Sequence, residues 1–298
     1  MNELRCSSEW QELLHSTDTY LFDCDGVVWQ SVTPLPGAIE AICCLQKLGK
    51  QIYFVTNKNT QSRIDTFYKF SKLGFTNIAI ENVYTSSYAT AHYLKHVLKL
   101  TGKVYLMGEA GMKTEIENAG FTCLDIGPDT MTGEPGEIEN IHIDPEVQAV
   151  VVATDYHFSY KKLVKAFFYL KNPACHYIGT SEDRVIPVGN GTIIPGATGS
   201  FIQAINYSTG RTATVIGKPY LPFINCIESE FPFERSRAVM IGDNLNSDIL
   251  FAKRAGLKSL LILTGVTKRA EFLAGYKDLP DNLIPDFFSD SLCSLTTQ

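Results

Sequence analysis

The stretch Thr19–Val27 reads TYLFDCDGV and joins a short apolar run directly to two carboxylates. A continuous apolar run of this length is typical of a strand that is buried on both faces of a sheet. Asp23 and Asp25 stand where the run ends, and Gly26 allows the chain to turn sharply. Two carboxylates are costly to bury as bare charges, so a bound cation is one interpretation, and a plain surface turn is the other.

Similar apolar runs recur along the chain, with helical patterns between them. The runs are Ile52–Thr56, Lys103–Met107, Ala149–Ala153, Tyr177–Ile178, Ala213–Gly217, Ala238–Gly242 and Ser259–Leu263. The helical patterns are Gly37–Leu48, Tyr160–Leu170 and Ser247–Ala255. This alternation predicts an α/β fold whose core is a Rossmann-like parallel sheet with helices on both faces.

The middle of the chain indicates a second unit. Gly127–Ile143 is rich in glycine, proline and acidic residues and interrupts the alternation. Strand-like runs flank it on both sides. We therefore expect residues 87–193 to form a second α/β unit inserted into the first, which residues 1–86 and 194–298 would build.

Composition excludes several classes of protein. The 298 residues are 45% hydrophobic and 19% charged, with a formal net charge of -6, which disfavours binding of nucleic acid through its phosphates. No stretch approaches the roughly 20 apolar residues of a membrane span, and the first residues do not resemble a signal peptide. The eight cysteines are scattered without a CxxC pair. This pattern favours reduced thiols in a cytoplasmic protein.

Further polar residues follow the other predicted strands, where open α/β sheets bind their ligands. Thr56 and Asn57 suit hydrogen bonds to phosphate oxygens, although Thr-Asn is also common in turns. Lys218 is suited to neutralise phosphoryl charge, and the alternative is an ordinary exposed lysine. Asp243 is placed to bind a metal ion. Asp248 either supports the site or is an acid in the first turn of a helix.

Two more observations complete this set. Pro195–Ser200 (PGATGS) precedes a helical pattern, and its backbone amides either face an anion or form a simple hinge. Mg²⁺ prefers oxygen ligands and commonly binds one or two carboxylates together with substrate phosphate. The combination predicts a phosphoryl-transfer centre that uses Mg²⁺.

These residues also carry a resemblance to a known family. DCDGV, VTN, the lysine of GKP and GDNLNSD match, in this order, the four motifs of the haloacid dehalogenase superfamily. Asp155–Leu163, PGATGS and LTGV are similar to the eukaryotic phosphoglycolate phosphatase and 4-nitrophenylphosphatase group. The resemblance covers nearly the whole chain. It implies a large α/β cap inserted between the second and third motifs.

The resemblance implies a role for each matching residue. Asp23 would attack phosphorus and form an aspartyl-phosphate, and Asp25 would act as general acid and then as general base. The side chains of Asp23 and Asp243 and the carbonyl oxygen of Asp25 would hold Mg²⁺.

The remaining matches concern the phosphoryl group. Thr56, Asn57 and Lys58 would bind its oxygens, Lys218 would balance its charge, and Asp248 would orient this arrangement. The family often has a second asparagine where this chain has Lys58. Other departures are Asn244 and Asn246, which replace a common arginine and aspartate, and the extra residue in PGATGS.

The implied substrates are small phosphorylated metabolites such as 2-phosphoglycolate, together with 4-nitrophenyl phosphate. Pyridoxal phosphate, glycerol 3-phosphate and a phosphotransferase reaction remain alternatives. The cap loop Thr180–Pro187 is the candidate for substrate choice, and Ile186 resembles the phosphoglycolate branch rather than the pyridoxal one. Arg184 either meets a substrate carboxylate or is an ordinary surface residue.

Two alternatives would not turn over a substrate: a signalling receiver and a binding module with an inactive site. A signalling receiver would need neither Asp25 nor a cap, and a dead binding site would not keep the complete set of residues. Related capped phosphatases often dimerise, so a homodimer through the cap is a further possibility.

Overall fold

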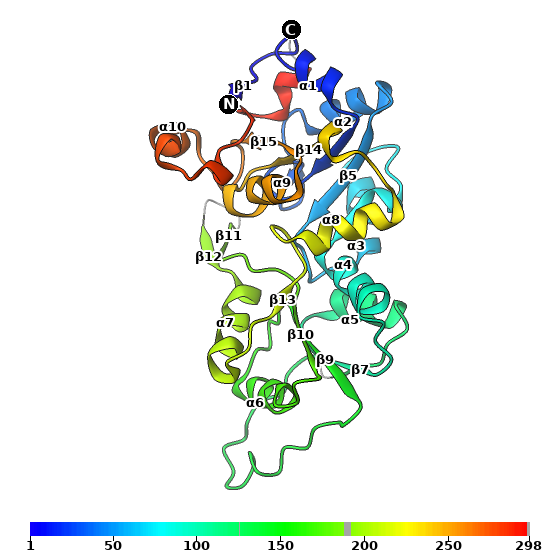
Figure 1. Ribbon diagram of the computed structural model, residues 1–298, viewed down its shortest axis with the longest axis vertical. Coiled ribbons are helices and arrows are strands. Elements are labelled where there is room, and N and C mark those ends of the chain that lie inside the picture. Colours follow the sequence, from blue (N-terminus) through cyan, green and yellow to red (C-terminus); the bar gives the residue numbers. More distant parts are fainter. Residues whose placement is uncertain (125, 188–191, 297–298) are drawn as a thin grey trace.

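A seven-stranded sheet organises the larger half of the protein. The computed structural model describes residues 1–124, 126–187 and 192–296 (Figure 1). All seven strands run parallel. Their order across the sheet is β1 (Asn2–Glu3), β16 (Phe287–Ser289), β15 (Lys258–Ile262), β14 (Ala238–Gly242), β2 (Thr19–Phe22), β5 (Gln51–Thr56) and β6 (Val83–Thr85).

Helices cover both faces of this sheet. Alternate side chains of a strand point to opposite faces, so the side chains of β2 belong to two separate apolar clusters. Tyr20 and Phe22 pack in one cluster, whereas Leu21 packs in the other. The helices of this half are α1 (Gln11–Ser16), α2 (Ala38–Lys47), α3 (Arg63–Lys72), α4 (Ser86–His92), α8 (Leu221–Glu230), α9 (Leu250–Ala255) and α10 (Arg269–Gly275). The predicted Rossmann-like α/β fold is confirmed.

A second parallel sheet forms the lower half of the molecule in Figure 1. Its order is β13 (Thr214–Val215), β10 (His176–Gly179), β9 (Val147–Val152), β7 (Lys103–Met107) and β8 (Cys123–Leu124). The helices α5 (Ala110–Asn118), α6 (Tyr160–Leu170) and α7 (Ala197–Thr209) accompany it. Residues 126–146 contain no helix or strand, in agreement with the interrupted pattern of the sequence.

The second sheet extends further along the chain than the expected limits 87–193. The run Ala213–Gly217 yields only the short strand β13, which pairs with β10 and so lies outside the first sheet. Ile202 and Ile205 of α7 and Val215 of β13 share one apolar cluster with the second sheet. Burial of these side chains explains why the chain rejoins the first sheet only after β13.

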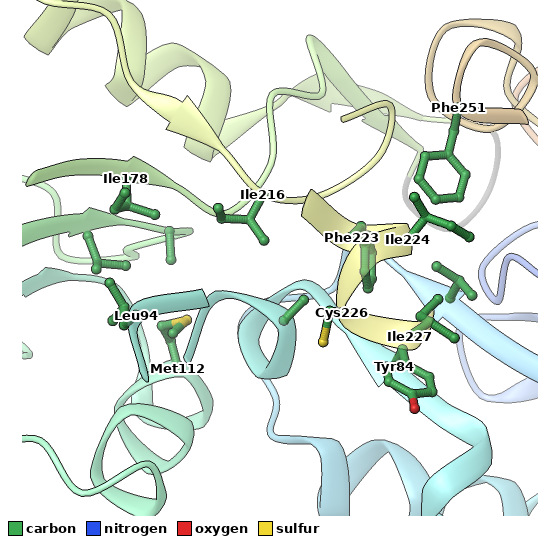
Figure 2. Close-up of a cluster of buried hydrophobic side chains, with 14 of the residues drawn as sticks. Tyr84, Leu94, Met112, Ile178, Ile216, Phe223, Ile224, Cys226, Ile227 and Phe251 are labelled. Carbon is green, nitrogen blue, oxygen red and sulfur yellow. The ribbon is translucent and has the colours of Figure 1, made fainter. Parts of the chain in front are cut away.

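The two halves share a continuous apolar interior. Figure 2 shows part of this cluster, in which Phe223 and Ile227 of α8 lie on one side and Met112 of α5 and Ile178 of β10 on the other. Two antiparallel hairpins stand apart from the sheets: β3 (Trp29–Gln30) with β4 (Thr33–Pro34), and β11 (Val185–Pro187) with β12 (Ile193–Pro195). Within the described ranges, no helix combines the length and apolar character needed to cross a membrane.

Candidate functional site

Most of the candidate catalytic and binding residues line one cavity of about 400 Å³ between the two sheets, and Asp248 contacts one of them, Lys218. Asp23 and Asp25 follow β2, Thr56 is the last residue of β5, and Asp243 follows β14. These three parallel strands are neighbours, so the four residues lie at the same edge of the sheet. Lys218 arrives from the segment after β13. The loops that follow β9 and β10, together with β11, contribute Thr154, Tyr156, Ser181, Asp183, Val185 and Ile186.

Lys218 connects two carboxylates at the floor of the cavity. Its Nζ lies 2.6 Å from Oδ1 of Asp23 and 2.7 Å from Oδ1 of Asp248, and its side chain is buried. Burial alone would lower the pKa of Lys218, but the two carboxylates outweigh it and the net pKa shift is upward. Lys218 therefore stays charged at neutral pH.

Asp248 is held from both sides. Its Oδ1 accepts from Lys218, while its Oδ2 accepts from the backbone N–H groups of Asp243 and Asn244 at 3.2 and 3.1 Å. These three contacts hold the side chain in a single orientation. This geometry favours the positioning role for Asp248 over the role of a simple first-turn acid.

Asp23 and Asp243 form the part of the site that suits a metal ion. Oxygens of Asp23, Asp243 and Asp248 lie within 4.8 Å of one another. Burial raises the pKa of Asp23 well above its usual value, and burial together with the nearby Asp248 raises the pKa of Asp243 to about 7. Three buried carboxylates share one ammonium, so a divalent cation would complete the charge balance.

Two glycines make room for the carboxylate of Asp243. A Cβ atom on Gly265 would lie 1.7 Å from Oδ2 of Asp243, and one on Gly26 would lie 2.3 Å from it. Gly26 also has a φ of +90°, which suits glycine alone. The backbone N–H of Val266 donates to Oδ2 of Asp243 at 2.5 Å. The pocket for this carboxylate is thus shaped by backbone on two sides.

Asp25 lies at the cavity wall rather than at its floor. The indole Nε1 of Trp29, on the β3–β4 hairpin, donates to Oδ1 of Asp25 at 3.1 Å. Asp25 is half-buried and lines the cavity. A carboxyl group that is oriented by one hydrogen bond and open to the cavity can exchange protons with a ligand there.

The residues at the end of β5 and just after it line the cavity, and some of them also contact the second half of the molecule. The amide of Asn57 accepts from the N–H of Lys218 at 2.9 Å and donates to Asp183 at 3.0 Å, so its side chain is occupied by protein groups. The hydroxyl of Thr56 accepts from the N–H of Lys58 at 3.1 Å. Thr56, Asn57 and Lys58 all line the cavity.

Asn59 is a residue that the sequence analysis missed. Its Oδ1 accepts from the N–H of Thr154 at 3.0 Å, and its Nδ2 approaches the hydroxyls of Ser181 and Thr198 at 3.4 and 3.3 Å. Asn59 is buried and links the first sheet to three segments of the second half. Its place two residues after Asn57 was the one available signal, and that signal is weak.

Arg184 and the PGATGS segment differ in whether they line the cavity. Arg184 is exposed and does not line the cavity, which favours the surface reading of this residue. Gly196 and Ala197, at the start of α7, do line it. A Cβ atom on Gly196 would lie 1.7 Å from the carbonyl oxygen of Asp183, so this glycine permits a close approach of two backbone segments.

Comparisons with known proteins agree with this architecture. A family model described as haloacid dehalogenase-like hydrolase matches residues 20–122, and a second, HAD-hydrolase-like, matches residues 215–292. The human glycerol-3-phosphate phosphatase is 38% identical over 96% of this chain and 92% of its own length. A 4-nitrophenylphosphatase of Schizosaccharomyces pombe is 39% identical over 98% of both chains.

Solved structures give the same result. A p-nitrophenyl phosphatase from Archaeoglobus fulgidus matches with a TM-score of 0.79 and 28% identity, covering 94% of this chain and 98% of that one. A glycerol phosphate phosphatase from Mycobacterium tuberculosis, in complex with magnesium, matches with a TM-score of 0.76 and 25% identity, covering 95% and 77%.

Proposed function

The chain belongs to the haloacid dehalogenase-like hydrolase family, and we propose that it hydrolyses small phosphate monoesters with Asp23 as the nucleophile. One observation carries this assignment above the others. The carboxylate of Asp23 is oriented by Lys218 through a single oxygen, and it lines the cavity together with Asp25 and Asp243. A carboxylate held in this way keeps its second oxygen for attack on phosphorus.

The reaction takes place in two steps. In the first, an oxygen of Asp23 forms a bond to phosphorus as the ester P–O bond breaks, and Asp25 gives its proton to the leaving oxygen. In the second, Asp25 removes a proton from water, the water oxygen bonds to phosphorus, and Asp23 is released with inorganic phosphate. Asp25 thus ends the cycle protonated, as it began.

Asp23, Asp243 and the carbonyl oxygen of Asp25 would hold Mg²⁺ at the floor of the cavity. Mg²⁺, when bound, reduces the repulsion between the anionic ester and the attacking carboxylate. The choice of this ion is supported by the oxygen-only donor set and by the magnesium complex of the similar glycerol phosphate phosphatase.

Other residues bind and orient the phosphoryl group. Thr56 and the backbone after it would donate to the phosphoryl oxygens, and Lys218 would balance their charge. Asp248 would keep Lys218 in place through the 2.7 Å contact. The side chain of Asn57 would fix the segment rather than touch the substrate, since its amide already contacts Lys218 and Asp183.

The unit built on the second sheet would act as a cap that encloses the substrate and limits water. The names of the relatives support 4-nitrophenyl phosphate and glycerol 3-phosphate as substrates. The sequence resemblance adds 2-phosphoglycolate, with pyridoxal phosphate and phosphoryl transfer to another alcohol as alternatives. All share a phosphate monoester small enough for the cavity.

The test is release of inorganic phosphate from these four esters, with and without Mg²⁺. We expect Mg²⁺-dependent turnover that Asp23→Asn abolishes while the variant keeps its melting temperature. Phosphate trapped on Asp23 in the wild-type chain would identify the nucleophile directly. Equal turnover by wild-type protein and Asp23→Asn would overturn the assignment, and so would folded wild-type protein that hydrolyses no ester.

Location and assembly are further expectations. All eight cysteines are unpaired, which suits the reducing cytoplasm. A homodimer through the cap would appear as a doubled mass in light scattering, and a monomer at micromolar concentration would contradict it.

A further inference from the structure

A histidine, a cysteine and a glutamate meet at the junction of the two halves. A ring nitrogen of His92, the Sγ atom of Cys226 and a carboxylate oxygen of Glu230 lie within 4.8 Å of one another. His92 is the last residue of α4, whereas Cys226 and Glu230 lie one turn apart on α8. None of the three is among the described residues that line the cavity, so this cluster is separate from the site above.

Neighbouring side chains orient two members of the cluster. The hydroxyls of Tyr84 and Tyr88 donate to different oxygens of Glu230, the first at 2.8 Å. On the other side, Nε2 of His92 lies 3.2 Å from the hydroxyl of Ser229 on α8. Each carboxylate oxygen keeps a lone pair beyond the one that accepts from tyrosine. Outer hydrogen bonds of this kind usually orient the ligands of metal centres.

The thiol of Cys226, which is labelled in Figure 2, points to the kind of ion. It is buried, and no described residue forms a hydrogen bond with its sulfur. Burial lowers the pKa of His92 and so keeps its ring neutral, as a metal ligand has to be, whereas burial raises the pKa of the Cys226 thiol. A mixed set of nitrogen, sulfur and oxygen donors suits zinc, whereas Mg²⁺ prefers oxygen alone.

The two helices occupy equivalent places in the chain. α4 lies between β6 of the first sheet and β7 of the second, and α8 lies between β13 of the second sheet and β14 of the first. α4 continues into a π-helical turn, Tyr93–Val97, and such turns are frequent at functional sites. The turn includes the exposed His96, whose ring centre lies 4.4 Å from that of His92. An ion between α4 and α8 would connect both crossings of the chain between the halves.

We propose that His92, Cys226 and Glu230 bind a zinc ion that connects the two crossings. His96 or a water molecule would take the fourth position of the tetrahedral site. On binding, a bond from sulfur to zinc replaces the S–H bond, and the proton passes to solvent. Zinc with one thiolate and one carboxylate is neutral, so it would not repel Arg63, whose Nη2 lies 3.6 Å from Oε2 of Glu230. This inference does not depend on the proposed function.

The first experiment uses Co²⁺ as a probe, because a bond between cobalt and thiolate absorbs strongly in the near ultraviolet and cobalt bound by oxygen does not. Reduced wild-type protein is titrated with Co²⁺ in excess Mg²⁺, which occupies the carboxylates of the cavity. We expect an absorption band that saturates at one ion per chain and that Zn²⁺, the tighter-binding ion, removes.

Three variants locate the ion. Cys226→Ser should lose the band, and Cys175→Ser, which removes another buried thiol, should keep it. His92→Gln should weaken the apparent affinity for Co²⁺ by about 100-fold, the upper end of the losses found when metal ligands lose their supporting partners. The side chain of His92 is only half-buried, so this variant tests the site without a change in the core.

The second experiment needs no cobalt. With Mg²⁺ present throughout, Zn²⁺ should raise the melting temperature of wild-type protein and of Cys175→Ser by several degrees, and that of His92→Gln by much less. A folded wild-type protein that shows no cobalt–thiolate band would overturn the inference. A band of unchanged strength in Cys226→Ser, or equal affinity for Co²⁺ in His92→Gln and the wild type, would overturn it as well.

Discussion

Lys218 and Asp23 form a buried ion pair, with 2.6 Å between Nζ and Oδ1, although 195 positions separate them in the sequence. Burial raises the pKa of Asp23, and Lys218 is the group that opposes this shift most strongly. The proposed role of Asp23 as nucleophile requires its carboxylate to be ionised. The ion pair with Lys218, which follows β13, therefore favours the ionised form of Asp23, which follows β2.

Lys218→Met should lower kcat by about 100- to 1,000-fold, the size of effect found when one electrostatic donor is removed from an active site. Methionine keeps the length of the side chain but removes its charge, so Asp23 loses its counter-ion. Steady-state kinetics at neutral pH and saturating Mg²⁺ measure the change. Lys253→Met is the control, since its pair with Asp286 is partly exposed and remote from the cavity. A kcat within a few-fold of wild type in Lys218→Met would contradict the role of this pair.

Removal of Mg²⁺ should destabilise the protein. The buried carboxylates Asp23, Asp243 and Asp248 share one ammonium, so a bound cation relieves their repulsion. An ion at 100 times its dissociation constant stabilises the folded state by about 2.7 kcal/mol. Melting curves with added Mg²⁺ or with EDTA should differ by several degrees for wild-type protein and by much less for Asp243→Asn. Identical melting curves for the wild type would count against the metal site.

The sequence was enough to predict that Asp23, Thr56 and Asp243 lie close together, because the signal for each is local. Each apolar run ends at its polar residue, and parallel strands bring their carboxyl ends to one edge. Asp23, Thr56 and Asp243 therefore meet once three neighbouring strands are assumed.

The contacts between the two halves could not be predicted in this way. Asn59 bonds to Thr154, which is 95 positions away, and a local pattern contains no information on such a pair. The run Ala213–Gly217 has the apolar character of a strand in either sheet. Only the packing of Val215 against the second half decides that β13 pairs with β10.

Gly265→Ala should disturb the site without any change of charge. The added methyl group would lie 1.7 Å from Oδ2 of Asp243, so this carboxylate has to move. We expect a weaker apparent affinity for Mg²⁺ and a lower kcat/KM, both obtained from activity as a function of Mg²⁺ concentration. Gly275→Ala is the matched control, because nothing lies within 4 Å of the position of its Cβ atom. The prediction is wrong if both variants respond to Mg²⁺ like the wild-type chain.

Asn59→Leu tests the contact between the halves. Leucine has a similar size but neither accepts from the N–H of Thr154 nor donates to Thr198. A buried polar group that loses its partner costs about 1–3 kcal/mol, so the urea midpoint should fall and KM should rise. The exposed Asn225→Leu should change the unfolding free energy by no more than about 0.5 kcal/mol. Equal midpoints for the two variants would show that Asn59 does not hold the halves together.

Asp25→Asn should separate the two chemical steps. Asparagine keeps the hydrogen bond from Trp29 but neither gives a proton to a leaving group nor takes one from water. 4-Nitrophenolate is a stable anion and leaves without protonation, whereas the alkoxide of glycerol needs a proton.

Rapid mixing of Asp25→Asn with 4-nitrophenyl phosphate should therefore release about one equivalent of nitrophenolate per enzyme, followed by slow turnover as the aspartyl-phosphate accumulates. Glycerol 3-phosphate should give no such burst of glycerol. Asp23→Asn, which lacks the proposed nucleophile, should give no burst with either ester. A burst of equal size from both esters in Asp25→Asn would mean that another group protonates the leaving oxygen, because an unassisted alkoxide could not depart as fast as nitrophenolate.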